Sequence, residues 1–248
     1  MNEQNNSKGK IALVTGANKG IGFEVARKLA ENGLTVFLGA RDAARGEAAA
    51  KALAAENLDV RPLVLDLWRP DTIHAAAEAI GHAFQRLDVL VNNAGINDPE
   101  DGAPGMVDLD AVRRVFETNF FGTVLVTQIM LPLIRKSASG RIVNVSSGLG
   151  SLTSTSASEG VSSDFSRLFG YSSSKAALNM FSIHLAKELK GTGILVNSAA
   201  PGFTATDMNN YRGHQTVEEG ARAPVQLALL PDDGPTGGYF DKNGVKPW

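Results

Sequence analysis

Short apolar runs alternate with longer helical patterns along almost the whole chain, and this alternation restricts the fold more than any other feature. Several runs are apolar at every position, as strands of a sheet covered on both faces must be. The repeated strand–helix–strand order predicts a doubly wound parallel sheet with helices on both faces. The predicted strands are residues 10–15, 34–40, 60–65, 87–91, 141–146, 194–199 and 238–240, and the predicted helices are 20–32, 43–56, 70–86, 109–136 and 171–190.

No change of composition divides the 248 residues, of which 43% are hydrophobic, so the chain can bury a sizeable core. We predict one α/β domain of about seven strands over residues 10–248. Residues 1–9 are polar and lack the apolar middle of a secretory signal, which predicts a loose tail. Three stretches without a clear pattern, 96–107, 148–169 and 203–220, follow the C-terminal ends of strands, where open α/β sheets bind ligands.

Composition excludes several classes of function. The net charge of −2 offers no basic field for nucleic acid, and no apolar run approaches the length that spans a bilayer, so we expect neither partner. The absence of cysteine excludes disulfides, thiolate catalysis and cysteine-ligated metals. The four histidines lack the paired spacing of a metal site. We therefore expect no metal and a cytoplasmic location.

Three glycines follow the first predicted strand, in the sequence TGANKGIG, and precede a predicted helix. Glycine lets the backbone turn tightly and approach a pyrophosphate, which then lies at the N-terminus of the helix. A tight turn with close helix packing explains one glycine well, but it explains three poorly. The pattern predicts a Rossmann-like dinucleotide site, with contacts from Gly16, Asn18, Lys19, Gly20, Ile21 and Gly22.

The stretch YSSSK, residues 171–175, places a tyrosine and a lysine one helical turn apart, where side chains share a face. A free tyrosine titrates near a pKa of ~10, too high for easy proton exchange at neutral pH. A neighbouring ammonium favours the phenolate, so we expect Lys175 to lower the pKa of Tyr171 and make it a usable acid. The alternative is a lysine that extends beside an amphipathic tyrosine on a helix surface.

Four motifs in this order resemble the signatures of the short-chain dehydrogenase/reductase family. The spacing G-x-x-x-G-x-G at 16–22 has the family's form, and NNAG at 92–95 resembles its second signature. YSSSK matches the family's Tyr-x-x-x-Lys, and PGFTATDM at 201–208 matches its Pro-Gly turn. The resemblance runs from about residue 10 to the C-terminus. It implies a nicotinamide cofactor and hydride transfer.

The resemblance also implies roles for individual residues. Tyr171 would protonate the substrate oxygen and Ser147 would orient it, with Ser147 matching the family position better than Ser146. Lys175 would also hold the nicotinamide ribose, and Asn119 would bind a water that links Lys175 to solvent. Ser147 could instead cap its own backbone. The implied cofactor site adds to the glycine loop Arg41, Asp66, Leu67, Asn93, Ala94, Gly95, Tyr171, Lys175, Pro201, Gly202, Thr204 and Thr206.

The end of the second predicted strand reads GARD, and it bears on the choice of cofactor. Family members that use NAD typically carry an acid where this chain has Ala40, whereas Arg41 and Lys19 fit a 2′-phosphate, so we expect NADPH/NADP+. Both cations could instead be solvated surface charges. Asp42 could pair with Arg41 or cap the next helix. Asp66 could be a plain helix cap, and the first asparagine of NNAG could brace the sheet.

Ser147 and Tyr171 are 171 − 147 = 24 residues apart, further than in most of the family. A longer insertion at this place is known in the monomeric carbonyl reductases, which TGANKGIG and GARDAARG also resemble. A monomer is therefore favoured, although a homo-oligomer stays open. Leu152, Phe165 and Phe203 are candidate walls of the substrate pocket, with a lid that does not touch the substrate as the alternative. The predicted substrate contacts are Ser147, Leu152, Tyr171 and Phe203.

Together these features predict NADPH-dependent reduction of a ketone or aldehyde to an alcohol, with Tyr171 as general acid. An alcohol or hydroxysteroid dehydrogenase that acts oxidatively is the first alternative, and the cations at the adenosine end disfavour it. A regulator that binds NADP(H) without turnover is the second. Such a protein would not need Asn119, Ser147, Tyr171 and Lys175 together. No motif identifies the carbonyl substrate or the stereochemistry of the product.

Overall fold

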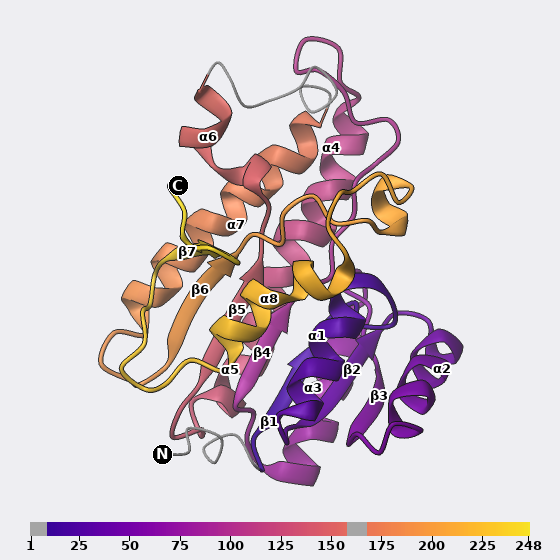
Figure 1. Ribbon diagram of the computed structural model, residues 1–248, viewed down its shortest axis with the longest axis vertical. Coiled ribbons are helices and arrows are strands. Elements are labelled where there is room, and N and C mark those ends of the chain that lie inside the picture. The colour runs from indigo at the N-terminus through magenta and orange to yellow at the C-terminus, as the bar shows by residue number, and fades with distance from the viewer. Residues whose placement is uncertain (1–8, 158–167) are drawn as a thin grey trace.

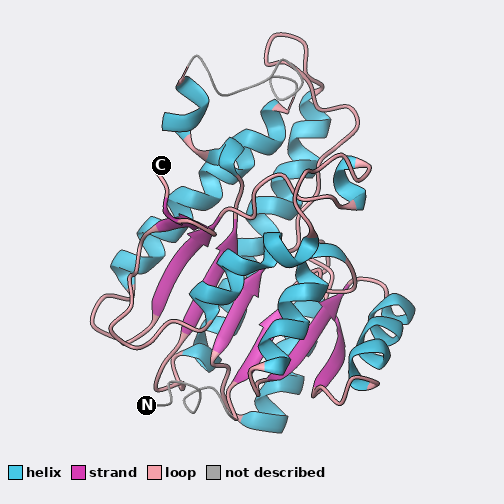
Figure 2. Cartoon of the chain, viewed as in Figure 1, coloured by secondary structure: helices cyan, strands magenta, loops and turns pink. Residues whose placement is uncertain are grey.

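One eight-stranded sheet runs through the part of the molecule that the computed structural model describes, residues 9–157 and 168–248 (Figures 1 and 2). The strand order is β3-β2-β1-β4-β5-β6-β7-β8, and every pair is parallel except β7 with β8. The strands are β1 Ile11–Val14, β2 Thr35–Ala40, β3 Val60–Val64, β4 Val89–Asn92, β5 Arg141–Val145, β6 Leu195–Ala199, β7 Tyr239–Asp241 and β8 Gly244–Val245.

The doubly wound parallel sheet is confirmed, with one strand more than the seven predicted. The additional strand, β8, has only two residues and follows a turn, so it leaves no hydrophobic period in the sequence. The chain order reverses between β1 and β4, which are neighbours in the sheet. The crevice at the carboxyl ends of these strands is where open α/β sheets bind their ligands.

Helices cover both faces of the sheet. One face is packed by α1 Gly20–Glu31, α2 Ala43–Ala54 and α8 Val217–Ala228, and the other by α3 Pro70–Phe84, α5 Thr123–Ile134 and α7 Phe169–Glu188. Successive side chains of a strand point to opposite faces of the sheet, so each strand contributes to both hydrophobic cores. On β1, for example, Leu13 belongs to one core cluster and Val14 to the other. The sequence analysis missed α8, whose pattern Gly220 and Pro224 interrupt, and the short helix α6 Leu152–Ser156.

Residues Leu109–Ile134 form one continuous helix, in which the π-helical turn η2 Glu117–Gly122 joins α4 Leu109–Phe116 to α5. Its length and composition would suffice to cross a membrane, which corrects the expectation that no apolar stretch is long enough. Half of its most apolar segment is buried inside the molecule, and Val126 and Met130 pack in the core beneath the sheet. Burial of this kind accounts for the apolar composition of the helix.

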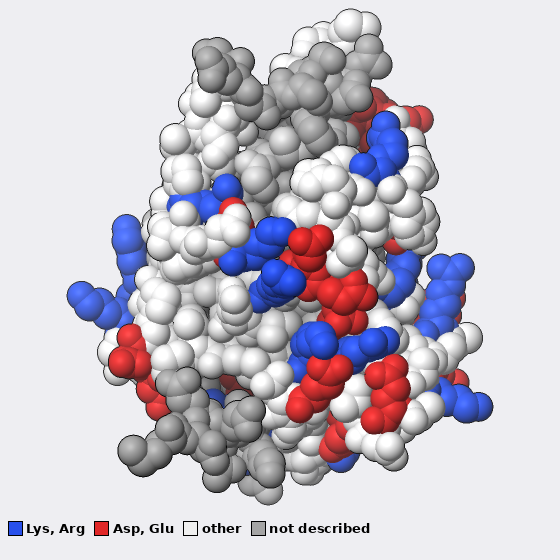
Figure 3. Space-filling model, in the orientation of Figure 1, with Lys and Arg blue, Asp and Glu red and all other residues white. Residues whose placement is uncertain are grey.

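Charged side chains of both signs lie next to one another on the face that Figure 3 shows. Local ion pairs in the molecule include Lys28 with Glu31 on α1 and Lys242 with Glu219 near α8. Over the described residues of this face, no broad surface carries a single sign. Residues 1–8 of the predicted tail lie outside the described residues, as does the candidate pocket residue Phe165.

Candidate active site

A cavity of about 660 Å³ lies along the carboxyl ends of the central strands. Its walls come from the glycine loop after β1, the turn after β4, the ends of β2 and β5, the start of α7 and the loop after β6. Every residue predicted to contact the cofactor lines this one cavity. Segments from Gly16 to Lys246, far apart in the sequence, therefore meet where the strand order reverses.

The glycine loop is pressed against the turn after β4. A Cβ atom at Gly22 would lie 2.3 Å from Asn93 Nδ2 and 2.7 Å from the Gly16 carbonyl oxygen, so no side chain fits there. Gly16 has φ +61°, and a Cβ on it would lie 2.8 Å from Ala94 Cα. Asn93 Nδ2 donates hydrogen bonds to the carbonyl oxygens of Thr15 and Gly16, at 2.9 and 3.1 Å.

This loop fits the phosphates of a dinucleotide. Gly16 and Gly22 let the loop pack closely against the turn after β4, and Lys19, the residue before α1, makes no side-chain cap for the helix, whose first residue is Gly20. The sequence analysis missed Thr15, whose Oγ1 accepts hydrogen bonds from the N–H groups of Asn93 and Ala94 at 3.0 Å each. Thr15 thus ties the glycine loop to the NNAG turn.

Three cations lie at the end of the cavity near β2: Lys19, Arg41 and Arg45. Asp42 caps α2 by accepting a hydrogen bond from the Arg45 N–H at 2.9 Å, and its carboxylate lies 3.9 Å from Arg45 Nε. The cap is the role that the sequence left open for Asp42, and no pairing with Arg41 is found. Lys19 pairs with Asp207 from the loop after β6. Sequence reasoning missed Arg45, which lies in the first turn of α2, four residues after Arg41.

The structure also separates the alternatives for two further residues. Asp66 Oδ1 accepts a hydrogen bond from the Trp68 N–H at 3.1 Å, whereas α3 begins only at Pro70, so Asp66 forms a local turn rather than a helix cap. Asn92 is buried, and its Nδ2 donates to Thr127 Oγ1 and Asn144 Oδ1. Asn92 therefore braces the sheet beneath the cavity, while its neighbour Asn93 faces the glycine loop.

Tyr171 and Lys175 share a face of α7, as their spacing predicts. Lys175 Nζ lies 5.7 Å from the centre of the Tyr171 ring and donates a hydrogen bond to the Val145 carbonyl oxygen at 2.8 Å. The hydroxyl of Ser147 lies beside Tyr171 and acts to lower its pKa. The end of β5 and the first turn of α7 thus bring a hydroxyl, a phenol and an ammonium together at the cavity.

Burial changes the pKa of both groups on α7. It raises the pKa of Tyr171, and the hydrogen bond with Ser147 acts in the opposite direction more weakly. It lowers the pKa of Lys175 to about 8. The expectation that the pKa of Tyr171 would be lowered is therefore wrong in direction, because desolvation of the phenolate outweighs other influences. At neutral pH the phenol keeps its proton and most Lys175 side chains are charged.

Asn119 lies behind the cavity wall, in the π-helical turn η2, and is fully buried. Its Oδ1 accepts a hydrogen bond from the Ile96 N–H at 2.8 Å, and its Nδ2 donates to the Ile96 carbonyl oxygen at 2.9 Å. A Cβ on Gly95 would lie 3.3 Å from both Asn119 Oδ1 and Lys175 Nζ. Asn119 and Lys175 thus meet across Gly95. A π-helical turn at such a place is common at functional sites.

Ser147 and Ser146 have different surroundings. Ser146 is buried and its Oγ donates to the Lys175 carbonyl oxygen at 3.4 Å, whereas Ser147 is half-buried beside Tyr171. Ser147 Oγ also accepts from the Leu149 N–H at 3.2 Å, so the capping alternative holds as well. Sequence reasoning missed Tyr239, whose hydroxyl donates to the Ser147 carbonyl oxygen at 2.7 Å and whose ring stacks on Trp248.

The substrate end of the cavity agrees only in part with the predicted walls. Phe203 lines the cavity, but Leu152 is 72% exposed on α6 and is not among the described lining residues. Leu149 and Leu168 line it instead. A five-residue helix such as α6 is too short for its sequence to indicate which side faces a pocket. This explains why Leu152 was predicted as a pocket wall. Within residues 9–157 and 168–248, no group of three possible metal ligands is found.

Comparison with known proteins agrees with this arrangement. The family model for short chain dehydrogenases matches residues 10–216. A short-chain dehydrogenase, anuI, from Penicillium roqueforti is 41% identical over 223 residues, which cover 88% of each chain. Carbonyl reductase [NADPH] 3 from Rattus norvegicus is 38% identical over 276 aligned positions, covering 96% of this chain and 98% of the relative.

A solved structure extends the likeness to the whole fold. The NADPH-bound carbonyl reductase from chicken fatty liver superposes with a TM-score of 0.85 at 28% identity, covering 97% of this chain and 100% of that one. The glycine loop, the NNAG turn and the Tyr–Lys pair on α7 all lie within the residues that the family model matches. The chain belongs to the short-chain dehydrogenase/reductase family, with similarity to its carbonyl reductases.

Proposed function

We propose that the chain catalyses the NADPH-dependent reduction of a ketone or aldehyde to an alcohol. The observation that carries this proposal is the grouping of Ser147, Tyr171 and Lys175 in a cavity that continues to the glycine loop. Two relatives support it by name, because the rat carbonyl reductase and the chicken structure are both NADPH proteins. The glycine cradle and the uncapped start of α1 fit the same cofactor.

In this proposal the residues along the cavity would hold the cofactor. The glycine loop and the N-terminus of α1 would hold its pyrophosphate. Arg41 and Arg45 would hold the 2′-phosphate, and Asp66 and Leu67 would contact the adenine. Lys175 would hold the nicotinamide ribose, and the loop after β6 would hold the carboxamide. When bound, NADPH supplies the hydride that the carbonyl carbon accepts. The predicted cofactor contacts in the loop after β6 are Pro201, Gly202, Thr204 and Thr206, which all line the cavity.

The chain's own residues handle the oxygen and the proton. The hydroxyl of Ser147 donates a hydrogen bond to the carbonyl oxygen and holds it beside Tyr171. As the oxygen gains negative charge, Tyr171 gives it the phenolic proton, and the carbonyl becomes an alcohol. The charge of Lys175 stabilises the phenolate that is left. Lys175 and Asn119, which meet across Gly95, return a proton from solvent.

Burial, which raises the pKa of Tyr171, is compatible with the role of a general acid in a reduction. A general acid must hold its proton until the substrate oxygen needs it, and burial keeps this phenol protonated at neutral pH. An oxidative dehydrogenase needs the phenolate as a base. The cluster of three cations near β2 favours NADPH, the usual donor in reductions, over NADH.

Removal of the guanidinium groups near β2 should weaken the binding of NADPH and leave the binding of NADH unchanged. We expect the Arg41→Ala and Arg45→Ala variants to raise KM for NADPH by about 10-fold each, because a charge-assisted hydrogen bond contributes about 1.5–3 kcal/mol. KM for NADH, which lacks the 2′-phosphate, should hardly change. Steady-state kinetics with both cofactors measure the difference.

A matched control is Arg61→Ala, which removes a guanidinium from β3 that pairs with Asp59 outside the cavity. Its KM for NADPH should equal that of the wild type. An equal rise of KM for both cofactors in the Arg41 and Arg45 variants would contradict the proposed 2′-phosphate site.

The proposed activity itself is tested by cofactor oxidation. NADPH and NADH consumption should be followed against aryl ketones, α-dicarbonyls, quinones and steroids at pH 7. We expect at least one class to be reduced, with NADPH as the better donor. A clear preference for NADH across the panel would contradict the cofactor assignment, and no reduction in any class would contradict the carbonyl reductase assignment.

A further inference from the structure

The first turn of α7, which carries Tyr171, has no cap of its own. The residue before the helix is Leu168, whose side chain cannot accept a hydrogen bond, and its backbone has φ −111° and ψ 48°. A helix leaves its first N–H groups without intrahelical partners, and buried N–H groups need acceptors from elsewhere. The first intrahelical bond here runs from the Ser172 N–H to the Leu168 carbonyl oxygen. Three earlier N–H groups must therefore be satisfied by other parts of the chain.

All three acceptors come from the loop after β4, about 70 residues away in the sequence. Asp101 Oδ1 accepts from the Gly170 N–H at 2.8 Å, and Asp101 Oδ2 accepts from the N–H of Tyr171 itself at 2.9 Å. The Phe169 N–H donates to the Gly102 carbonyl oxygen at 3.4 Å. The start of the helix is seated closely, because a Cβ on Gly170 would lie 3.2 Å from Asp101 Oδ1 and 3.3 Å from Val112 Cα.

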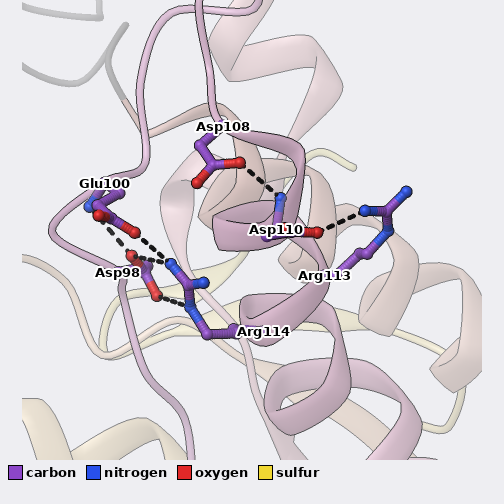
Figure 4. A network of polar contacts seen from close by, with 6 residues as sticks. All are labelled: Asp98, Glu100, Asp108, Asp110, Arg113 and Arg114. Carbon is purple, nitrogen blue, oxygen red and sulfur yellow. Dashed lines mark hydrogen bonds and ion pairs between the residues drawn. The ribbon is translucent and has the colours of Figure 1, made fainter.

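The loop that carries Asp101 is held in turn by α4. Arg114 makes two bonds to the carboxylate of Asp98, from Nε at 2.8 Å and Nη2 at 3.1 Å, and Nη2 also donates to Glu100 Oε2 at 2.6 Å (Figure 4). The Arg114 guanidinium holds the pKa of Asp98 below its usual range. The Asp101 N–H donates to the Asp98 carbonyl oxygen at 3.0 Å. Arg114 thus fixes the turn from which Asp101 reaches α7.

From these contacts we infer that Asp101 is a positioning residue for Tyr171, acting as a cap supplied from a distant loop. This inference rests on the proposed function and deepens it. With both N–H groups bound to one carboxylate, the backbone of Tyr171 is fixed at the point where its side chain leaves the helix. The negative charge of the carboxylate also offsets the positive end of the α7 dipole, which favours the protonated phenol.

The test compares Asp101→Ala with Asp108→Ala. Asp108 caps α4 through a hydrogen bond from the Asp110 N–H at 2.9 Å, so both variants lose one aspartate cap and both should lose a few degrees of Tm (Figure 4). We expect the Asp101→Ala variant to lower kcat about 10-fold, with the Kd for NADPH within about twofold of the wild type. Asp108→Ala should leave both constants unchanged.

Two further variants examine how Asp101 acts. Asp101→Asn keeps one acceptor oxygen, so its kcat should lie between those of the wild type and Asp101→Ala. Arg114→Ala releases Asp98 and Glu100 and should lower kcat in the same direction by a smaller factor. A kcat within about twofold of the wild type in Asp101→Ala would overturn the inference, since misplacement of a reacting group has larger effects.

Hydrogen–deuterium exchange separates this inference from the proposed function, because it needs neither substrate nor cofactor. In the wild type, the amides of Gly170 and Tyr171 should exchange slowly, and in Asp101→Ala they should exchange at least about tenfold faster. Asp108→Ala should leave them protected. Unchanged protection in Asp101→Ala would overturn the capping role. A wild type without carbonyl reduction but with this pattern of exchange would overturn only the proposed function.

Discussion

Replacement of Tyr171 by phenylalanine is expected to lower kcat for carbonyl reduction by about 10²–10⁴-fold, the usual contribution of a positioned general acid. The variant keeps the ring that packs beside Lys175 and loses the hydroxyl beside Ser147. NADPH affinity should stay within about twofold, because the glycine loop and the cations near β2 are untouched. Stopped-flow kinetics and fluorescence titration with NADPH measure the two quantities.

The chain offers a matched control for this substitution. Tyr211 lies in the loop after β6, is 71% exposed and does not line the cavity among the described residues. Tyr211→Phe removes a hydroxyl from the same residue type and should leave kcat and NADPH affinity unchanged. If Tyr171→Phe retained a kcat near that of the wild type, another group would have to be the acid, and Tyr171 would lose its proposed role.

Replacement of Lys175 by methionine is expected to abolish most activity and, in the same protein, to raise thermal stability. Lys175 is 4% exposed, and burial lowers its pKa from 10.5 to about 8, which corresponds to about 3 kcal/mol of unfavourable free energy at neutral pH. The hydrogen bond to the Val145 carbonyl oxygen, which the variant loses, offsets about 1 kcal/mol. A net gain of about 2 kcal/mol raises Tm by about 4–8 °C in a chain of this length.

The pH dependence of this gain has a definite sign. The pKa of Lys175 is lower in the folded state than in the unfolded state, so the unfolded chain binds more protons between about pH 8 and 10.5. The stability of the wild type relative to Lys175→Met therefore rises with pH in that window and is constant below it. Scanning calorimetry should show a smaller difference in Tm between Lys175→Met and the wild type at pH 9.5 than at pH 7. A lower Tm for the variant at pH 7 would contradict the account.

The sequence predicted the parts of the site that are encoded locally. Three glycines between a strand and a helix, and a tyrosine four residues before a lysine, are patterns within one element, and both lie where they were expected. Short apolar runs placed the seven longer strands, because most strands of this sheet are buried along their length.

The remaining features depend on contacts between distant segments. Asp101 acts on a helix about 70 residues away, and Tyr239 bonds the carbonyl of Ser147 across 92 positions, so neither leaves a local pattern. The direction of the Tyr171 pKa shift could not be predicted because it depends on how deeply the fold buries the phenol. Leu152 was misplaced for a related reason, since only the packed fold decides which side of α6 faces the cavity.

Transfer of deuterium from NADPH that carries deuterium at both C4 positions of the nicotinamide, to the best ketone or aldehyde of the panel, tests the central claim most directly. The account predicts that the wild type forms an alcohol with one deuterium on the former carbonyl carbon for each NADPH consumed. It also predicts that Tyr171→Phe binds the cofactor yet forms this alcohol at least about 10²-fold more slowly. An alcohol without deuterium, or equal rates of formation by the two proteins, would contradict it.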